Sequence, residues 1–336
     1  MTDRPPYLLR PVRAEDREAL IAVHNATYAG DRGHGMNPMD GRVWDWRYGV
    51  NGTAHASSVA EDRETSEIAA YVGGIARHIW MRGELTGGIQ SLDLMTAPSR
   101  SQGLRRVGVF GRLVRYWCDC NFSADDKWIA FGFPSTAAFR IGRRFGGYRL
   151  YRPVNVLVHS SPAKLRDRSA GLELRTVECV SPDVDGLWNR CARDIELAVV
   201  RNAEYFSWRY ERHPRFAYRM VEARDRGGAL RGLLVTRHGA VGQDVTMLMD
   251  WLAPLDDEDA IRALLAACAG AAREAGAGSV VAWFPEGQPW FERFQDEGFR
   301  VRFTSIIHVG RSWKREFPVE DIRRAIYATC GDIEYY

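Results

Sequence analysis

Along the first half of the chain, alternating apolar and polar residues predict strands, and apolar residues spaced three to four apart predict helices. The expected strands are Tyr7–Val12, Ala56–Ala60, Glu67–Trp80, Thr86–Thr96, Lys127–Phe133 and Tyr148–Ser160. The expected helices are Ala14–Tyr28, a short one at Trp46–Tyr48, 104–119 and Ser135–Phe145. Strands interleaved with helices predict an α/β fold with a mixed, partly antiparallel sheet.

The second half of the chain repeats the first. Matched pairs are Leu9–Val12 with Leu174–Val177, Trp46–Tyr48 with Trp208–Tyr210, Asp93 with Asp250, Phe133–Pro134 with Phe284–Pro285, and Gly147–Arg149 with Gly298–Arg300. The offset between members falls from 165 at the first pair to 151 at the last and never reverses. Chance matches would not stay in order, so we expect two tandem copies of one fold.

The repeat sets the expected domain boundaries at 1–159 and 171–310, with a linker at 160–170 and a C-terminal extension at 311–336. The linker is polar and contains a proline, as linkers often do. In the second copy we expect a helix at Asp259–Ala275, a strand at Ser279–Phe284 and a helix at Trp290–Glu297. The last residues, Gly331–Tyr336, are expected to fray, although their acids and aromatics would also suit the lining of an amine pocket.

Composition narrows the class of protein. The net charge of +3 is too close to neutral to favour a nucleic-acid-binding protein. All but three of the 46 basic residues are arginine, a bias that we attribute first to a GC-rich coding sequence. The N-terminal residues lack the apolar core of a signal peptide, and no apolar run is long enough to span a membrane. We expect a cytoplasmic protein, without a nucleic-acid or membrane partner, that is a monomer or a homodimer.

Six cysteines are spread along the chain, and only Cys118 and Cys120 are close in sequence. Their spacing matches no common zinc or redox motif, so we expect reduced thiols and no metal.

The segment 96–108, TAPSRSQGLRRVG, leads from an expected strand into an expected helix. The first backbone N–H groups of a helix have no internal partner and attract anions. Gly103 allows close approach of a ligand to the backbone, while Arg100, Arg105 and Arg106 add positive charge. The pattern predicts a phosphate-binding loop, with a simple helix start and a nucleic-acid patch as the alternatives.

Residues Arg100–Arg105 resemble the pyrophosphate loop of the GNAT superfamily of acyl-CoA-dependent N-acyltransferases, whose signature is Arg/Gln-x-x-Gly-x-Gly/Ala. Arg105 departs from it, standing where glycine or alanine is usual. The downstream GFPS and FGGY segments match the superfamily as well. The resemblance implies two tandem GNAT-like domains and acetyl-CoA or another acyl-CoA as donor. The donor-binding residues that it implies are Leu94, Met95, Thr96, Arg100, Ser101, Gln102, Gly103, Leu104, Arg105, Phe133 and Ser135.

The corresponding loop of the second copy reads Leu255-Asp256-Asp257-Glu258-Asp259 and contains no glycine. Its acids suit a helix N-terminus but repel a pyrophosphate. The segment from Pro254 to Pro285 is also five residues shorter than the corresponding segment of the first copy, from Pro98 to Pro134. We therefore expect one acyl-CoA per chain, bound by the N-terminal copy.

Two residues are candidates for the base that takes the amine proton, Asp93 and His34. Asp93 lies in an apolar strand, where burial is expected to raise its pKa, although Asp250 has the same place in the second copy. His34 lies in a loop that often forms the acceptor pocket in this superfamily, whereas His24 is expected to be structural.

Many GNAT enzymes carry a tyrosine as general acid four residues before the glycine of a Gly-Phe/Tyr pair. Counted back from Gly146, that position is Gly142, so the leaving thiolate either departs unassisted or is protonated by another group such as Tyr148 or Tyr151.

The expected function is transfer of an acyl group, in first place acetyl, to the amine of a small molecule. An amino sugar or a secondary metabolite, as in antibiotic biosynthesis, would be such an acceptor. Two alternatives remain open at this point. One is a transferase of related tandem fold that uses aminoacyl-tRNA, and the other is a non-catalytic protein that binds acyl-CoA.

Overall fold

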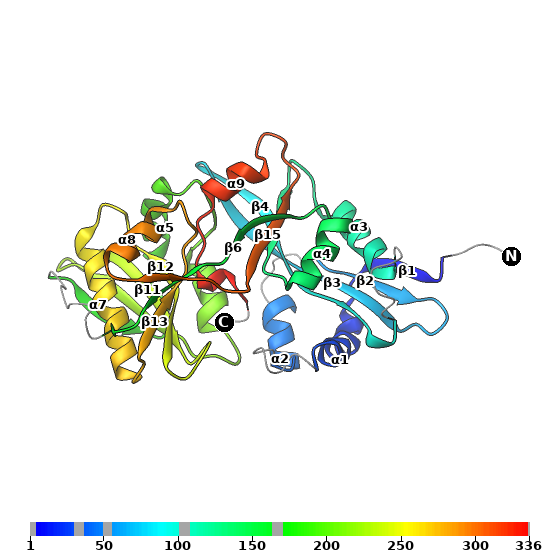
Figure 1. Ribbon diagram of the computed structural model, residues 1–336, viewed down its shortest axis with the longest axis horizontal. Helices are drawn as coiled ribbons and strands as arrows, with labels where there is room; N and C mark the ends of the chain where they lie inside the picture. Colours follow the sequence, from blue (N-terminus) through cyan, green and yellow to red (C-terminus); the bar gives the residue numbers. More distant parts are fainter. Residues whose placement is uncertain (1–4, 30–36, 50–55, 101–107, 163–170, 335–336) are drawn as a thin grey trace. The chain divides into compact units, whose positions relative to one another are not determined.

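The computed structural model describes residues 5–29, 37–49, 56–100, 108–162 and 171–334 (Figure 1). The chain forms two compact units, and neither is a single continuous segment. The first unit contains Met1–His78, Thr86–Arg152 and Ile306–Glu320. The second contains Ile79–Leu85, Pro153–Ser305 and Asp321–Tyr336.

The first unit is built on a sheet with the strand order β1-β2-β3-β4-β5-β15-β6. Its strands are β1 (Tyr7–Pro11), β2 (Ser58–Asp62), β3 (Ile68–Met81), β4 (Glu84–Thr96), β5 (Lys127–Gly132), β15 (Ile307–Ser312) and β6 (Arg149–Pro153). The helices are α1 (Arg17–Thr27), α2 (Gly41–Trp44), α3 (Val109–Asn121) and α4 (Thr136–Phe145), with short turns η1 (Ala14–Asp16), η3 (Asp45–Gly49) and η4 (Pro98–Arg100). In Figure 1, α1 and α2 lie below the strands and α3 and α4 above them, so helices cover both faces of the sheet.

The second unit is built on a sheet with the order β8-β10-β11-β12-β13-β7-β14. Its strands are β8 (Glu173–Val177), β10 (Arg219–Arg224), β11 (Leu230–His238), β12 (Val245–Leu252), β13 (Ser279–Ala282), β7 (Val156–His159) and β14 (Arg300–Arg302), and β9 (Leu197–Val199) pairs with the end of β3. The helices are α5 (Val184–Cys191), α6 (Ala203–Phe206), α7 (Glu258–Glu274) and α8 (Pro289–Asp296), with turns η6 (Ala192–Asp194) and η7 (Ser207–Glu211). The C-terminal segment adds α9 (Val319–Ala325) and η8 (Cys330–Asp332).

The two sheets have the same topology. The β4–β5 pair of the first sheet is parallel, and so is the β12–β13 pair at the corresponding place in the second. The pairs β1–β2 and β2–β3 are antiparallel, as are their counterparts β8–β10 and β10–β11. The expected duplication and the expected mixed sheet flanked by helices are therefore confirmed.

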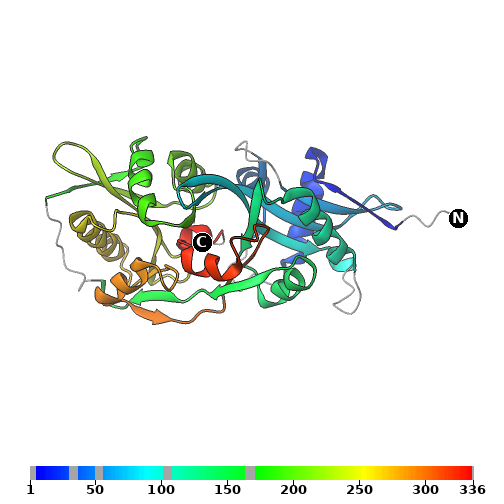
Figure 2. The ribbon, with the colours of Figure 1, turned by 90° about the horizontal axis from the view of Figure 1, so that it is seen from above.

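The two copies exchange their last strands. Strand β7, which follows β6 along the chain, pairs with β13 and β14 of the second sheet. Figure 2 shows the green β7 lying beside the orange β14. In return, β15 near the end of the chain lies between β5 and β6 of the first sheet. Each sheet thus has its sixth strand supplied by the other copy.

Because of this exchange, the expectation of a single final strand at Tyr148–Ser160 is wrong. The chain forms β6 up to Pro153 and then β7 from Val156, and the two strands belong to different sheets. Domain boundaries at 159, 171 and 310 accordingly cut across both compact units. Of the linker expected at 160–170, residues 163–170 lie outside the described residues.

Two repeated glycines occupy the same backbone conformation. Gly147 precedes β6 with φ +69°, and Gly298 precedes β14 with φ +92°. Both values lie in the left-handed region, which residues with a Cβ rarely adopt. The recurrence of Gly-Tyr/Phe-Arg in the sequence therefore reflects a turn that each copy needs before its edge strand.

Replacing Gly298 by alanine tests this turn. We expect Gly298→Ala to lower the free energy of unfolding by about 1–2 kcal/mol, because a left-handed residue with a Cβ is strained. The added Cβ would also lie 3.3 Å from Nε2 of His159. Urea unfolding at pH 7 measures the change.

Gly186→Ala is the matched control, because Gly186 is exposed within helix α5, where alanine is favoured by up to about 1 kcal/mol. Equal stability of the two variants would show that the turn does not need glycine.

Candidate functional site

Both sheets open at the same position, between the two strands of the parallel pair. Pairing of β4 with β5 ends at Gln90 and Phe131. Pairing of β12 with β13 ends at Met247 and Val281. In each copy the repeated aspartate, Asp93 or Asp250, follows three residues after the last paired residue. In open α/β sheets, ligands bind at the carboxyl ends of parallel strands where neighbours diverge.

The strand that borders each opening is irregular at this point. Asp93 has φ +47°, in the left-handed region, although it lies inside β4. In the second sheet the pairing of β11 with β12 shifts between Asp250 and Leu248, so that Met249 is an extra residue in β12. A bulge of this kind bends a strand and breaks its ladder, and bulges are common beside active sites.

Asp93 is the centre of a buried polar cluster. Its carboxylate accepts a hydrogen bond from Tyr48 Oη at 2.6 Å and pairs with Arg47 Nη1 at 2.8 Å. His24 Nε2, from helix α1, lies 3.6 Å from the other carboxylate oxygen. Tyr48 and Arg47 come from the turn η3, so three separate segments of the chain meet at Asp93.

The expected rise in the pKa of Asp93 is wrong. Burial alone would raise the pKa, but the charge of Arg47, the nearby His24 and the hydrogen bond from Tyr48 outweigh it and hold the pKa well below its usual range. A carboxylate that is so strongly stabilised as an anion is a weak proton acceptor. The assignment of Asp93 as the base remains a prediction, and its bonds favour a role in holding β4 in place.

The same bond occurs in the second copy. Asp250 accepts hydrogen bonds from Tyr210 Oη at 2.8 Å and from Tyr205 Oη at 2.9 Å. Tyr210 is the repeat of Tyr48, as Asp250 is the repeat of Asp93. The repeated Trp-Arg-Tyr segment and the repeated aspartate are thus joined by a hydrogen bond in both copies. Sequence reasoning overlooked Arg47 and Tyr48 at the site, and the joint recurrence of both motifs was the signal that could have found them.

In the second copy the C-terminal tail fills the opening. Tyr327 Oη donates to the carbonyl of Trp251 on β12 at 2.6 Å, and Thr329 Oγ1 lies 3.2 Å from the carboxylate of Asp250. On the other side of the opening, the ring of Tyr327 lies against the ring of Phe284, just beyond β13, with the centroids 6.3 Å apart. The tail therefore contacts both sides of the opening.

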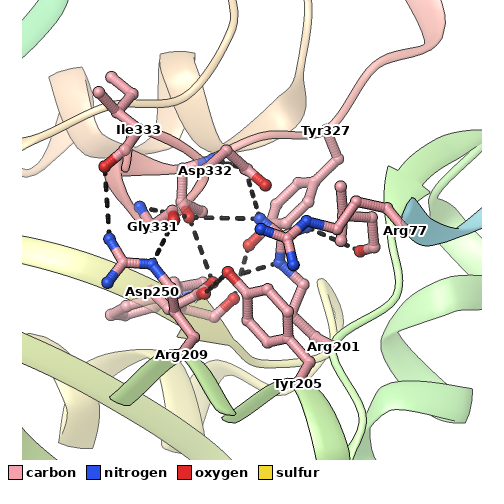
Figure 3. A network of polar contacts seen from close by, with 12 residues as sticks. Arg77, Arg201, Tyr205, Arg209, Asp250, Tyr327, Gly331, Asp332 and Ile333 are labelled. Atoms are coloured by element: carbon pink, nitrogen blue, oxygen red, sulfur yellow. Dashed lines mark hydrogen bonds and ion pairs between the residues drawn. The ribbon is translucent and has the colours of Figure 1, made fainter. Parts of the chain in front are cut away.

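Two buried arginines fix this tail. Arg201 has no exposed surface and forms ion pairs with Asp332 and Asp250. Arg209, the repeat of Arg47, donates to the carbonyls of Gly331 at 2.9 Å and Ile333 at 3.3 Å. Figure 3 shows Arg209 reaching the turn at Gly331 and Ile333 while Arg201 reaches Asp332. The expectation of a frayed terminus is wrong for residues 331–334, because residues 325–334 are all buried, and Tyr335 and Tyr336 lie outside the described residues.

The first copy places part of the expected donor-binding strand at its own opening. Leu94, Met95 and Thr96 lie on β4 beyond its last pair with β5. The carbonyl of Leu94 accepts from Tyr28 Oη at 3.3 Å, and that of Thr96 accepts from Thr27 Oγ1 at 3.5 Å. These two carbonyls are thus already engaged by the end of α1.

Two further expected donor-binding residues follow β5. The ring of Phe133 is buried and stacks on the ring of His308, with the centroids 4.6 Å apart. Ser135 is exposed and caps helix α4 by accepting from the N–H of Ala138 at 3.3 Å. Neither observation tests contact with a donor.

Several predicted residues cannot be placed. Ser101, Gln102, Gly103, Leu104 and Arg105 lie outside the described residues, as does His34. The backbone of Arg100 ends the turn η4, and its side chain is also outside the described part of the chain.

The place of the missing tyrosine is filled by another aromatic ring. A Cβ at Gly142 would lie 3.4 Å from the ring of Tyr148. Tyr148 and Tyr151 are both buried, and burial raises the pKa of both phenols. A raised pKa makes either phenol a poorer general acid for a thiolate.

Neither a metal-binding cluster nor a membrane-spanning helix occurs in the described residues. The described residues contain no group of three or more His, Cys, Asp or Glu side chains that could hold a metal ion. Among the helices in the described ranges, none is long and apolar enough to cross a membrane.

Comparison with known proteins identifies the fold. No protein-family model and no curated protein sequence matches the chain. Solved structures do match. A protein of unknown function from Enterococcus faecalis, described as a probable N-acyltransferase, has a TM-score of 0.67 at 10% identity, over 93% of this chain and 74% of its own.

A GCN5-related N-acetyltransferase from Anabaena variabilis has a TM-score of 0.64 at 12% identity, over 91% of this chain and 73% of its own. An N-myristoyltransferase from Saccharomyces cerevisiae, solved with myristoyl-CoA, has a TM-score of 0.57 at 13% identity, over 92% and 85%. The chain therefore has the tandem GNAT fold, as the sequence resemblance implied.

Replacing Asp93 by asparagine tests the buried cluster. We expect Asp93→Asn to lower the free energy of unfolding by about 3–5 kcal/mol at pH 7, because it removes the buried negative charge that pairs with Arg47. Urea unfolding of both proteins between pH 7 and pH 3 measures the difference. Asp126→Asn, at an exposed pair with Lys127, is the control and should change stability by less than about 1 kcal/mol.

The pH dependence of stability follows from the direction in which the pKa of Asp93 is shifted. Because the folded pKa of Asp93 is lowered, its stabilisation is present above the unfolded pKa of about 4 and is lost as the pH falls towards the folded value. The difference in the free energy of unfolding between wild type and Asp93→Asn should therefore become smaller below pH 4. A gap that widens in acid would contradict the lowered pKa.

Thiol reactivity tests the tail. In the native protein we expect two of the six cysteines, the exposed Cys120 and Cys179, to react promptly with a thiol reagent. Cys330 is buried and its pKa is raised by burial, so it should react only after opening of the tail. Asp332→Ala removes the ion pair that ties Arg201 to the tail and should make a third thiol reactive. The exposed Glu320→Ala serves as control, and an unchanged count of two in Asp332→Ala would show that the tail is held by other contacts.

Proposed function

We propose that this protein is an acyl-CoA-dependent N-acyltransferase in which the first unit binds the donor and the acceptor is the amine of a small molecule. The observation that carries the proposal is the opening between β4 and β5, in the tandem GNAT fold, beside a loop of the pyrophosphate-binding type. The three compared proteins are described as a probable N-acyltransferase, an N-acetyltransferase and an N-myristoyltransferase. Acetyl is the acyl group that we put first, and an amino sugar or secondary metabolite is the kind of acceptor.

The contrast between the two openings supports a single donor site. In the second copy, Arg209 and Asp250 bind the chain's own tail where a donor would lie. In the first copy, the corresponding Arg47 turns to Asp93 instead. The acidic loop Leu255–Asp259 of the second copy also disfavours a pyrophosphate. One acyl-CoA per chain follows.

The chemistry needs few protein groups. The amine loses a proton and its nitrogen forms a bond to the thioester carbon, after which the C–S bond breaks and the thiolate leaves. Backbone N–H groups of Leu94–Thr96 are our proposed donors to the oxyanion, since a bulged strand directs such groups away from its ladder. His34 is our first choice for the base, because the lowered pKa of Asp93 makes that carboxylate the weaker candidate.

A non-catalytic acyl-CoA-binding protein is the second candidate. The bonds that engage Asp93 favour it, because they stabilise this buried carboxylate as an anion and so make it a weak base. Turnover separates the two candidates: release of CoA that requires an added amine from a panel of amino sugars and aliphatic amines supports the enzyme. Tight binding without amine-dependent release across the panel supports the binding protein.

Isothermal titration with acetyl-CoA and longer acyl-CoAs tests the donor site. We expect one site per chain, and loss of binding by at least tenfold in Gly103→Trp, because an indole would block close approach of the pyrophosphate to the loop. Gly227→Trp, at an exposed loop of the second unit, is the matched control and should bind as wild type does.

Absence of binding, or equal binding by both tryptophan variants, would overturn the proposal. Two sites per chain would overturn the part of it that excludes the second copy.

A further inference from the structure

We propose that the outer faces of α3 and α4 form a docking surface for an acidic carrier protein, which presents the acyl group as a thioester on a phosphopantetheine arm. The inference rests on the proposed function and adds a second form of donor to it. The transfer itself is unchanged: the amine nitrogen bonds to the acyl carbon, the C–S bond breaks, and the amine proton goes to the thiolate that stays on the arm.

Five exposed arginines gather on these two helices of the first unit. Those on α3 are Arg112 and Arg115, and those on α4 are Arg140, Arg143 and Arg144. Within each helix their spacing of three or four residues places them on one face. The guanidinium groups of Arg115 and Arg144 both lie over the ring of Phe145, at 5.7 Å and 5.3 Å from its centroid. The two arginine faces therefore join into one surface, which we call the arginine face.

Four of the five arginines of this face have no counter-ion among the described residues. Among the described residues, no carboxylate forms an ion pair with Arg112, Arg115, Arg140 or Arg143. Exposed arginines elsewhere in the chain do pair, as Arg219 does with Glu274. Helix α4 contains no acidic residue at all. A cluster of unpaired like charges is mildly unfavourable for folding and favours an anionic partner from outside.

The position of the face relates it to the donor. Helix α3 follows the expected pyrophosphate loop, and α4 follows β5, which borders the opening of the first sheet. Both helices therefore start at the open end of the β4–β5 pair. The sequence already supplies Arg100, Arg105 and Arg106 in the loop for a pyrophosphate, so five further arginines exceed what the phosphates of CoA require.

The pattern of charge favours a protein over a polyanion. At the far end of α3, the exposed Asp119, Asp125 and Asp126 border the arginines with opposite charge. A nucleic acid carries uniform negative charge and would be repelled there, whereas a protein surface of mixed charge can match the pattern in one orientation. The large apolar side chains that are exposed in the described residues, Leu85, Val241 and Phe303, lie on neither helix, which disfavours insertion into a membrane.

Isothermal titration with two donors tests the inference without knowledge of the acceptor. The first donor is a bacterial acyl carrier protein loaded with a non-hydrolysable acetyl-phosphopantetheine analogue, and the second is acetyl-CoA. The variant is the double charge reversal Arg112→Glu with Arg143→Glu. Arg273→Glu, at an exposed arginine in the last turn of α7 in the second unit, is the matched control. Circular dichroism and urea unfolding verify that the variants fold.

We expect the double variant to bind the loaded carrier at least tenfold more weakly than wild type and acetyl-CoA within twofold of wild type. Binding of the carrier should also weaken steeply between 50 and 400 mM salt, as electrostatic docking does. The control variant should match wild type with both donors.

Three results would overturn the inference. One is failure of wild type to bind the carrier while acetyl-CoA binds, which leaves the proposed function intact. Another is equal loss of both donors in the double variant, which would assign the arginine face to the phosphates of CoA. The last is tight binding of bulk tRNA at 150 mM salt that the double variant loses, which would assign the face to nucleic acid. Failure to bind either thioester donor would instead contradict the proposed function itself.

Discussion

Buried backbone groups must be hydrogen-bonded, and this requirement governs what happens where a parallel strand pair opens. The first sheet opens after the fourth residue pair of its central strands, at Gln90, and the second sheet opens after the third, at Met247. The second copy meets the requirement with its own tail, held by Tyr327 and Thr329. The fold thus provides one opening closed by protein and another at the corresponding place in the first sheet, where we propose that a ligand binds.

Duplication followed by divergence explains the residues around each opening. The tyrosine–aspartate bond is present in both copies and serves the bent strand itself. The arginine beside the tyrosine has diverged, because Arg47 pairs with Asp93 whereas Arg209 binds carbonyls of the tail. A residue that recurs in both copies is therefore weak evidence for catalysis, and a residue whose partner differs between copies tells more about their separate roles.

Local patterns were sufficient for most helices and strands and for the duplication, because periodicity and repeated motifs are properties of short segments. They failed at Tyr148–Ser160, where one apolar run serves two sheets, since no local pattern records which sheet a strand joins. They also failed for the tail, whose acids look soluble in isolation, whereas Asp332 pairs with Arg201 and Arg209 binds the carbonyl of Gly331. The pKa of Asp93 was mispredicted for the same reason: its sign depends on Arg47, which is 46 residues away in sequence.

The exchanged strands have a consequence for synthesis of the chain. The first sheet needs β15, residues Ile307–Ser312, between β5 and β6. A ribosome must therefore translate more than 300 residues before the N-terminal sheet can be completed, although domains commonly fold in order as they emerge. Until then β5 and β6 present unsatisfied edges, which are sites of aggregation. The N-terminal unit that we propose to bind the donor is consequently completed only near the end of synthesis, shortly before the segment Asp321–Tyr336 completes the second unit.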